Sequence, residues 1–235
     1  MNLTFVIPCY NSETIILKNY NLLINFFKKN SLKAKIIYIN DGSKDNTLKK
    51  LYSIKNKNVS IINNKVNCGK SYSVINALKK VKTKYVILID CDLPYIKYLN
   101  NIIQKLKKFD LILVNRKIKG SKNKENSQNF YQVLRHVISN FLGDIVEKKL
   151  NLEVSGDTQA GLKGFRIIKK FKKEKFISKY YFFDIELIRF FKRNNLKIKM
   201  IPVKYKISKK SNIKIFSFKN FIYIYELFNI LRKYS

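Results

Sequence analysis

Several residue types that often carry enzyme chemistry are scarce in this chain. Its 235 residues include one histidine, three cysteines and no tryptophan. The single histidine, His136, excludes a metal site built from several histidines and argues against a Ser-His-Asp triad. The cysteines Cys9, Cys68 and Cys91 are odd in number and lack CxxC spacing. They argue against a disulfide scaffold or a zinc site and indicate a reducing compartment.

Long apolar runs are also missing. No stretch approaches the roughly 20 residues that span a bilayer, and the chain enters a predicted strand at 3–7 without a signal-peptide pattern. We therefore expect a cytoplasmic protein whose membrane contact is peripheral, at the cytoplasmic face. A length of 235 residues allows one large α/β domain or two small ones, and a hydrophobic fraction of 46% is enough for a sizeable core.

Acidic residues are few, since 15 Asp and Glu face 49 Lys and Arg, for a formal net charge of +34. Such a charge favours anionic partners, namely nucleic acid, an acidic membrane surface or a phosphorylated substrate. An AT-rich genome would produce the same abundance of Lys, Asn, Ile and Tyr by itself. Part of the charge is therefore compatible with a solvated surface that has no specific partner.

The most distinctive stretch is the apolar run 85–89 followed by Asp90-Cys91-Asp92. A short, unbroken, β-branched run predicts a strand buried on both faces. Ligands bind at the carboxyl ends of such strands in open α/β sheets. Two carboxylates one residue apart repel each other unless a cation lies between them, and hard divalent cations prefer oxygen ligands. The stretch predicts a Mg²⁺ or Mn²⁺ site that holds a diphosphate; the alternative is a turn with two solvated acids.

Strand and helix patterns alternate through the first half. Strands are predicted at 3–7, 36–39, 59–62, 85–89 and 111–114, the first ended by Pro8. Helices are predicted over apolar positions 15–27, capped by Ser12, over 47–54, over apolar positions 74–81, and over 98–107. Gly69-Lys70 at the start of the third helix suits an anion. Four successive βα units predict an α/β fold with a mostly parallel sheet flanked by helices.

The second half has a different texture, with no Pro-, Gly- or Ser-rich linker before it. Its predicted elements are a polar loop at 115–128, an amphipathic helix at 130–150, a loop of small residues at 155–161, a strand at 162–166, a helix from 182, an edge strand at 197–205 containing Pro202, and an aromatic amphipathic segment at 218–231. We predict a single domain, 1–235, with a nucleotide-binding half (1–115) and an acceptor half (116–235).

Three loop motifs follow three of the predicted parallel strands, so all three are expected at one sheet edge: Pro8-Cys9-Tyr10-Asn11, Asn40-Asp41-Gly42-Ser43 and Asp90-Cys91-Asp92. Their order and spacing resemble the family 2 glycosyltransferases of the GT-A fold. Residues 157–163 are similar to the Asp-Thr-Gln-Cys-Gly-Phe-Lys segment of the dolichyl-phosphate β-glucosyltransferases. Residues 183–186 resemble the Phe-Asp-x-Glu of the polyprenyl-phosphate hexose synthases, including the mannose synthases.

This resemblance implies roles for the matching residues. The nucleotide would be bound by Pro8, Tyr10, Asn11, Asp41, Lys70, Asp90 and Arg116. Mg²⁺ or Mn²⁺ would be held by Asp90 and Asp92. The residues expected to carry the chemistry are Asp92, Asp157, Gln159 and Arg135, and those expected at the acceptor phosphate are Arg135, Lys209 and Lys214.

Two departures from the family pattern affect these roles. Pro94 stands where the mannose synthases often have Gln as a further metal ligand, so phosphate and water would complete the coordination. The closing loop, usually with Arg, is here lysine-rich over 208–214. Lysine supplies charge but not the two-pronged geometry of arginine.

The resemblance also implies an activity, namely an inverting, metal-dependent hexosyltransferase. It would move a hexose from a nucleotide sugar, UDP-glucose or GDP-mannose, to polyprenyl or dolichyl phosphate, and the 157–163 loop favours UDP-glucose. Because a lipid monophosphate is already ionised near neutral pH, no general base is required. The expected partners are the nucleotide sugar, the polyprenyl-phosphate lipid, an anionic membrane surface and a membrane-anchored partner subunit.

Two alternatives stay open. A family 2 transferase of surface polysaccharide or glycolipid assembly would act on a sugar hydroxyl and need a carboxylate base, for which Asp157 or Asp184 would serve. A basic nucleic-acid-binding protein would explain the charge and the aromatic residues. However, the basic residues are spread over every surface segment, so we expect no nucleic acid. Asp45 is expected to cap a helix, His136 to be structural, and Glu186 to be either functional or a surface or buried acid.

Overall fold

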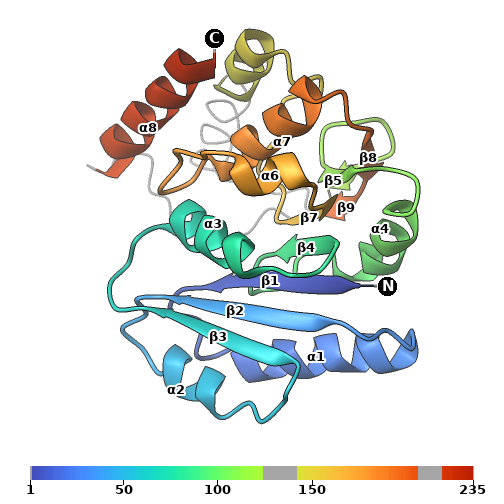
Figure 1. Cartoon of the computed structure of the whole chain (residues 1–235), viewed down its shortest axis with the longest axis vertical. Coiled ribbons are helices and arrows are strands. Elements are labelled where there is room, and N and C mark those ends of the chain that lie inside the picture. The colour runs from blue at the N-terminus through green and yellow to red at the C-terminus, as the bar shows by residue number, and fades with distance from the viewer. Residues whose placement is uncertain (1, 124–141, 206–218, 235) are drawn as a thin grey trace.

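The computed structural model describes residues 2–123, 142–205 and 219–234, and these residues form a seven-stranded sheet of order β3-β2-β1-β4-β7-β5-β8 (Figure 1). Its strands are β1 (Leu3–Cys9), β2 (Lys35–Asp41), β3 (Val59–Asn64), β4 (Tyr85–Ile89), β5 (Leu111–Asn115), β7 (Leu162–Arg166) and β8 (Ile198–Pro202). Neighbouring strands are parallel except at β7, which is antiparallel to β4 and β5. The predicted mostly parallel sheet is confirmed.

Helices cover both faces of this sheet (Figure 1). One face packs on α1 (Ile16–Lys29), α2 (Thr47–Tyr52) and α4 (Leu99–Lys105), which follows the 3₁₀ turn η1 (Ile96–Tyr98). The other face packs on α3 (Lys70–Lys80), α6 (Lys169–Lys173), α7 (Phe183–Arg193) and α8 (Lys219–Tyr234). Within β1, Phe5 and Ile7 join the first core and Val6 the second, as the period of two in a strand requires.

β7 joins the two halves of the chain in one sheet. It follows the loop 155–161 and lies between β4 and β5. Ile89 of β4 pairs with Leu162 of β7. The amide of Asp90 donates to the carbonyl of Gly161 (3.1 Å). The strand therefore brings the small-residue loop of the second half beside the Asp-x-Asp turn of the first. A separate short pairing joins β6 (Lys122–Asn123) to β9 (Lys204–Tyr205).

The prediction that Pro8 ends the first strand is wrong. β1 continues to Cys9, and Pro8 is in register with Ile39 of β2. The pairing of β1 with β4 stops at Val6. Pro8 thus lies where the strand has one neighbour, so the missing amide hydrogen breaks no ladder on the open side.

The predicted caps of the first two helices differ in outcome. Ser12 does not cap α1 through its side chain, because its Oγ donates to the Tyr10 carbonyl (3.2 Å) and its amide donates to Thr47 Oγ1 (2.7 Å). Asp45 accepts from the amide of Thr47 (3.0 Å), the first residue of α2, although Asn46 holds the N-cap position.

The long helix predicted at 130–150 is described only from residue 142, and 142–150 are helical. Of the residues predicted on its apolar face, Val146 is buried, but Leu142 and Ile145 are exposed; Leu150 is also buried. β8 lies at the end of the sheet order, so the edge position inferred from Pro202 is confirmed. Among the described ranges, no helix combines the length and apolar character that crossing a bilayer requires.

Candidate active site

The three sequence motifs lie at the carboxyl edge of the sheet, after β1, β2 and β4. The first two turns bind each other directly. The Asn11 amide donates to Ser43 Oγ (3.0 Å), and the Lys44 amide donates to Asn11 Oδ1 (2.9 Å). Tyr10 and Asn11 are exposed, and Pro8 is half-buried. Tyr10 and Asn11 thus present their side chains to solvent at this edge, where a ligand would meet them.

Asp41 lies beneath this edge and is almost completely buried. Its carboxylate accepts hydrogen bonds from the amides of Cys68 and Gly69 (both 3.0 Å) and from Ser73 Oγ (2.8 Å) and Asn64 Nδ2 (3.0 Å). The loop before α3 is therefore tied to the end of β2. The role of Asp41 as an acceptor for a nucleobase stays a prediction.

The N-terminus of α3 does not present an open anion site, contrary to the expectation from Gly69-Lys70. The amides of Cys68 and Gly69 bind the carboxylate of Asp41. The amides of Ser71 and Tyr72 donate to the carbonyls of residues 180 (3.3 Å) and 179 (2.8 Å). A helix start does attract an anion, and here that anion is a side chain of the protein.

Lys70 reaches from the start of α3 to the Asp-x-Asp turn. Its Nζ lies 2.6 Å from Asp90 Oδ1, and both side chains are about one-third exposed (32% and 34%). Burial by itself would lower the pKa of Lys70, but the charges of Asp90 and then Asp184 raise it above its ordinary value. Because Gly69 binds Asp41 and Lys70 binds Asp90, two adjacent residues connect the second and third turns.

Asp92 is exposed at the end of the same turn. Loss of part of its water shell and then the charge of Asp90 raise its pKa. Leu93 and Tyr95 follow with positive φ angles of 50° and 63°, which are strained for residues of this size. The charge of Asp90 thus acts on Asp92 within a strained turn, and a bound cation would offset the repulsion between the two carboxylates.

The donor set of this turn fits a hard divalent cation. Asp90 and Asp92 offer carboxylate oxygens, the ligands that Mg²⁺ and Mn²⁺ prefer. Gly161 leaves room for Asp90, because a Cβ there would lie 2.5 Å from Asp90 Oδ2. In the described part of the chain, no cluster of three or more His, Cys, Asp or Glu side chains is suited to a metal. A cation bound here would take its remaining ligands from substrate and water.

Arg116 and Asp157, both predicted site residues, bind each other. Arg116 Nη2 lies 2.5 Å from Asp157 Oδ1, Nε donates to Oδ2 (3.0 Å), and the Arg116 amide donates to Oδ2 (2.6 Å). Asp157 is buried, which would raise its pKa, but the bonds and charge of Arg116 outweigh burial and lower it. The Arg116 side chain is about one-third exposed (36%), so part of it stays accessible to a ligand.

Lys163 and Asp184 form a second, deeper ion pair. Lys163 Nζ lies 3.0 Å from Asp184 Oδ1, and the two side chains are 4% and 7% exposed. Lys163 Nζ also donates to the Ala160 carbonyl (2.6 Å). The pair fastens the loop 155–161 to α7. Gln159 in this loop is half-buried, with Thr158 Oγ1 3.5 Å from its Nε2.

Three residues near the site were missed by the sequence prediction: Lys163, Tyr95 and Tyr181. Lys163 closes the 157–163 motif, so a signal for it was present. Tyr95 interacts with Arg116, and burial raises its pKa. Tyr181 interacts with Lys70 and Asp90, and burial raises its pKa as well. In a chain with 15 tyrosines, nothing in the sequence distinguishes these two.

Glu186, left open by the sequence, is buried and accepts hydrogen bonds from the amides of Ile177 (3.0 Å) and Ser178 (2.8 Å) and from Tyr234 Oη (2.6 Å). It therefore holds the segment before α7. The predicted acceptor residues Arg135, Lys209 and Lys214, and also His136, lie outside the described residues.

Comparisons with known proteins bear on the family and the fold. The sequence profile of Glycosyl transferase family 2 matches residues 4–166. Poly-beta-1,6-N-acetyl-D-glucosamine synthase of Staphylococcus aureus (strain COL) is 38% identical over 92 residues, covering 38% of this chain and 21% of that protein. The chain thus spans about a fifth of the first curated relatives it matches. A dolichyl-phosphate beta-glucosyltransferase of Trichomonas vaginalis is 26% identical over 234 residues, covering 90% of this chain and 68% of that protein.

Solved structures share the fold. Mannosyl-3-phosphoglycerate synthase from Rubrobacter xylanophilus aligns with a TM-score of 0.70 at 12% identity, covering 99% of this chain and 74% of that chain. Glucosyl-3-phosphoglycerate synthase from Mycobacterium tuberculosis, in complex with Mn²⁺, UDP and phosphoglyceric acid, aligns with a TM-score of 0.62 at 15% identity. The alignment covers 98% of this chain and 75% of that chain. With the profile match over most of its length, this chain belongs to the family 2 glycosyltransferases and has the GT-A fold.

Proposed function

We propose that this glycosyltransferase moves a hexose from a nucleotide sugar, UDP-glucose or GDP-mannose, to a polyprenyl or dolichyl phosphate with inversion at the anomeric carbon. Residues 1–115 would bind the donor and residues 116–235 the acceptor. Similarity to the Trichomonas vaginalis dolichyl-phosphate beta-glucosyltransferase over 90% of the chain supports this acceptor and favours glucose.

The observation that carries the proposal is the state of two carboxylates. A transferase acting on a sugar hydroxyl needs a base, and Asp157 and Asp184 are the candidates. Asp157 is bound by Arg116, which lowers its pKa, and Asp184 is paired with Lys163 in the interior. The Asp184 carboxylate is already occupied by Lys163 Nζ, and a carboxylate with a lowered pKa, such as Asp157, is a weak proton acceptor. An acceptor phosphate, already ionised, reacts without one.

In the proposed step, an acceptor phosphate oxygen forms a bond to the anomeric carbon while the bond from that carbon to the donor diphosphate breaks. The electron pair leaves with the nucleoside diphosphate, whose growing charge needs cations nearby. Arg116 would face that charge, since its guanidinium is partly open and is oriented by Asp157. Lys70 would orient Asp90. Arg135, Lys209 and Lys214 are predicted to hold the acceptor phosphate.

Asp90 and Asp92 would hold Mg²⁺ or Mn²⁺, which when bound supplies positive charge at the departing diphosphate. Complexes of the Mycobacterium tuberculosis relative contain UDP with Mn²⁺ or Mg²⁺, which supports a divalent metal for this chain. The metal would also offset the repulsion that raises the pKa of Asp92.

We further propose contact with an anionic membrane surface. α8 exposes Ile224, Tyr225 and Phe228 to between 59% and 68%, while Leu227 and Ile230 on its other side are buried. A helix with one apolar face in the core and another in solvent, on a chain of charge +34, suits the interface of an acidic leaflet. A membrane-anchored partner subunit would add to this contact.

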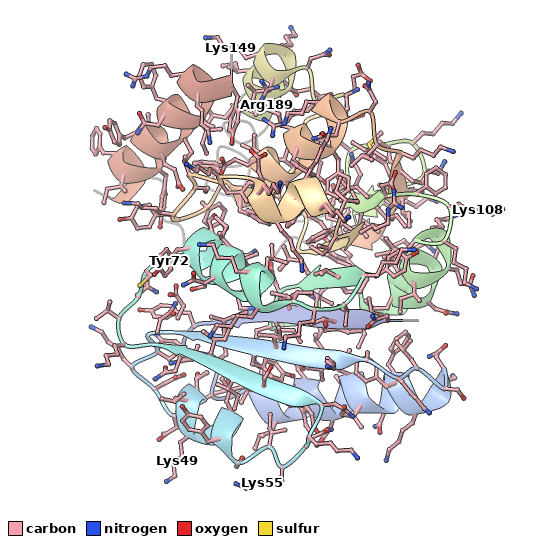
Figure 2. All side chains as sticks on the ribbon, in the orientation of Figure 1. Lys49, Lys55, Tyr72, Lys108, Lys149 and Arg189 are labelled. Atoms are coloured by element: carbon pink, nitrogen blue, oxygen red, sulfur yellow. The ribbon has the colours of Figure 1, made fainter. Side chains whose placement is uncertain are left out.

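A sugar hydroxyl in polysaccharide or glycolipid assembly is the second candidate acceptor, favoured by the 38% identity to the Staphylococcus aureus synthase over 92 residues. Nucleic acid is not favoured as a partner. The labelled lysines Lys49, Lys55, Lys108 and Lys149 lie at the lower, right and upper margins in Figure 2, so they do not form one stripe.

One assay separates the two acceptors. Radiolabelled UDP-glucose and GDP-mannose are offered, with Mg²⁺ or Mn²⁺, to polyprenyl phosphate and to a glycan primer in parallel. We expect label in the lipid fraction that is released by mild acid, as for a glycosyl phosphate. Transfer to the glycan alone would refute the lipid-phosphate proposal.

A further inference from the structure

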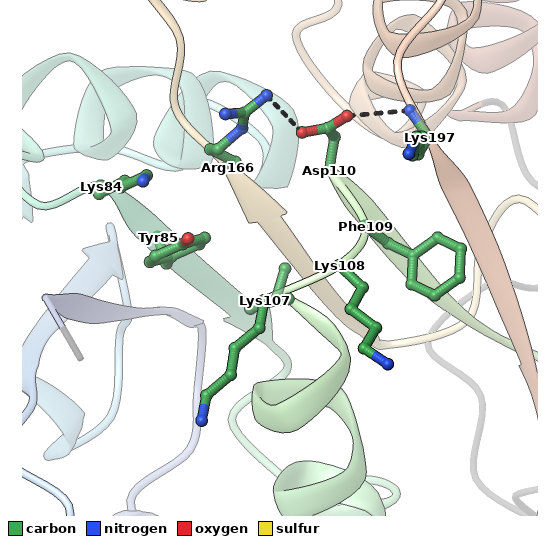
Figure 3. Close-up of a pocket in the computed structure, with 9 residues that line it drawn as sticks. Lys84, Tyr85, Lys107, Lys108, Phe109, Asp110, Arg166 and Lys197 are labelled. Atoms are coloured by element: carbon green, nitrogen blue, oxygen red, sulfur yellow. Dashed lines mark hydrogen bonds and ion pairs between the residues drawn. The ribbon is translucent and has the colours of Figure 1, made fainter.

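A hollow lies at the amino-terminal edge of the parallel strands, opposite the three turns. It has a volume of about 290 Å³. Its walls come from the starts of β4, β5 and β8, the end of β7 and the segment after α4 (Figure 3). Because the strands separate the two edges, a ligand here would leave the donor site free.

The lining of this cavity is strongly basic. Five of the nine lining residues are cationic and one is acidic: Lys84, Lys107, Lys108, Arg166 and Lys197 against Asp110. The lysines are exposed, so their ammonium groups are free to turn toward a ligand. Tyr85, Leu106 and Phe109 supply the remaining surface. The lining thus combines a few apolar side chains with an excess of hydrogen-bond donors.

The backbone beneath the basic side chains is fixed by hydrogen bonds across four strands. The Ile167 amide donates to the Lys84 carbonyl (2.8 Å), the Arg166 amide to the Asp110 carbonyl (2.8 Å), and the Asp110 amide to the Lys197 carbonyl (2.8 Å). The sheet therefore fixes the backbone positions of Lys84, Arg166 and Lys197. A site on a fixed backbone loses little conformational entropy when a ligand binds.

The single acid does not neutralise the cavity. Asp110 Oδ1 lies 2.6 Å from Arg166 Nη2, and its Oδ2 accepts from the backbone amide of Lys197 (2.9 Å). The Asp110 carboxylate therefore orients the Arg166 guanidinium, and the lysine ammonium groups are not paired with this carboxylate. Arg166 Nε is buried and has no acceptor within the described ranges. A buried donor without a partner is costly, and a bound anion at this cavity would supply acceptors.

We propose that this cavity binds the phosphate group of a phosphorylated ligand, either a free small molecule or a lipid headgroup, at a site separate from the donor site. Lysine and arginine form their strongest hydrogen bonds with phosphate oxygens, and 290 Å³ admits a phosphate with a short organic group. A bound ligand would contact the segment after α4 and the ends of β4, β5, β7 and β8.

The test uses one headgroup chemistry in two forms. Glycerol 3-phosphate is titrated by calorimetry with EDTA present, so that no divalent metal supports binding at the Asp-x-Asp turn. Vesicles with phosphatidic acid in a neutral lipid are assayed by sedimentation. The variant is Lys84→Gln/Lys197→Gln. The control, Lys49→Gln/Lys55→Gln, removes two exposed lysines at the lower margin in Figure 2, so the net charge changes equally.

We expect the cavity variant to lose about tenfold or more in affinity for at least one probe, the scale of one or two charge-assisted hydrogen bonds, while the control stays within about twofold of the unaltered protein. Loss for glycerol 3-phosphate identifies a free ligand, and loss for vesicles alone identifies a lipid headgroup. Equal affinity of the two double variants for both probes, or no binding by the unaltered protein, would overturn the proposal. Neither result bears on the proposed sugar transfer, because that activity is measured in a separate assay.

Discussion

Lys163 Nζ, on β7, lies 3.0 Å from Asp184 Oδ1, on α7, with both side chains in the interior. These residues belong to the two motifs that link the chain to the lipid-phosphate hexosyltransferases. Lys163 also holds the Ala160 carbonyl, and the charge of Asp184 contributes to the raised pKa of Lys70. The pair therefore connects the loop 155–161 to α7, and the charge of Asp184 also acts on Lys70 at the start of α3.

Removing one partner of this pair should lower the free energy of unfolding strongly, whereas removing both partners should not. Lys163→Met leaves the buried Asp184 carboxylate unpaired, and we expect a loss of about 3–5 kcal/mol in the free energy of unfolding. Lys163→Met/Asp184→Leu should recover most of that loss, because no uncompensated charge remains. Urea denaturation of the two single variants and the double variant gives the coupling energy. Additive losses would contradict a direct interaction.

Asp92→Ala should abolish sugar transfer, and added Mn²⁺ should not restore it, because the turn would keep only Asp90 as a carboxylate ligand. Asp92 is exposed, so the variant should unfold at the same urea concentration as the unaltered protein. Asp144→Asn, also exposed and on another element, serves as the control and should retain transfer. Full turnover by the Asp92 variant would exclude a metal role for this residue.

The pH dependence of stability should report on Asp157. Its pKa in the folded protein is lowered, since Arg116 outweighs the effect of burial. Its ionised form thus contributes stability above the unfolded value of about 3.9, and that contribution is lost as the pH falls through the lower folded pKa. We expect Asp157→Asn to be less stable at pH 7, with the difference shrinking below about pH 4. A difference that stays constant with pH in urea titrations would contradict this assignment.

Glu226 should control the segment before α7. Its carboxylate accepts from the amides of Lys179 (2.6 Å) and Tyr180 (2.8 Å) and from Ser178 Oγ (2.7 Å). Glu226→Leu leaves buried donors unpaired, at about 1–3 kcal/mol, and amide exchange at 179–181 should accelerate. Glu226→Gln keeps one acceptor oxygen and should give an intermediate result. Unchanged exchange in the Leu variant would show that this carboxylate does not hold the segment.

The aromatic face of α8 gives a separate test of membrane contact. Ile224→Ser/Tyr225→Ser/Phe228→Ser should reduce sedimentation with vesicles rich in anionic lipid. The variant has less apolar surface to bury in the interface, and each Å² of that surface contributes about 25 cal/mol to binding. The control replaces Leu22, Tyr52 and Val66, which are exposed elsewhere, by Ser. An equal loss in both triple variants would contradict a specific role for α8.

Most of the sheet, and the position of the three motifs of the candidate site at one sheet edge, could be predicted because their signals are local. The run 85–89 became β4 with the predicted bounds, and the helix starting near Thr47 formed over 47–52. Once alternating strands and helices imply a parallel sheet, the carboxyl ends of β1, β2 and β4 must share an edge. Asp90 and Asp92 directly follow the run 85–89, so the strand pattern alone placed them at that edge.

Pairings between distant residues could not be predicted in the same way. That Asp41 would bind Cys68 and Gly69, or Arg116 bind Asp157, depends on how far-apart segments pack, and hydrophobic periodicity carries no information about this. Pro8 stayed in β1 only because the neighbouring strand β4 stops short of it.

By itself, the sequence determined the class of the fold, the carboxylates at the strand ends and the basic charge, because periodicity, turn residues and composition act locally along the chain. Only the tertiary structure decided that β7 would enter between β4 and β5 in the opposite direction. That insertion sets Gly161 against Asp90 at one edge of the sheet and Arg166 beside Asp110 at the other. Such contacts arise from the balance of packing over the whole molecule, which no single segment specifies.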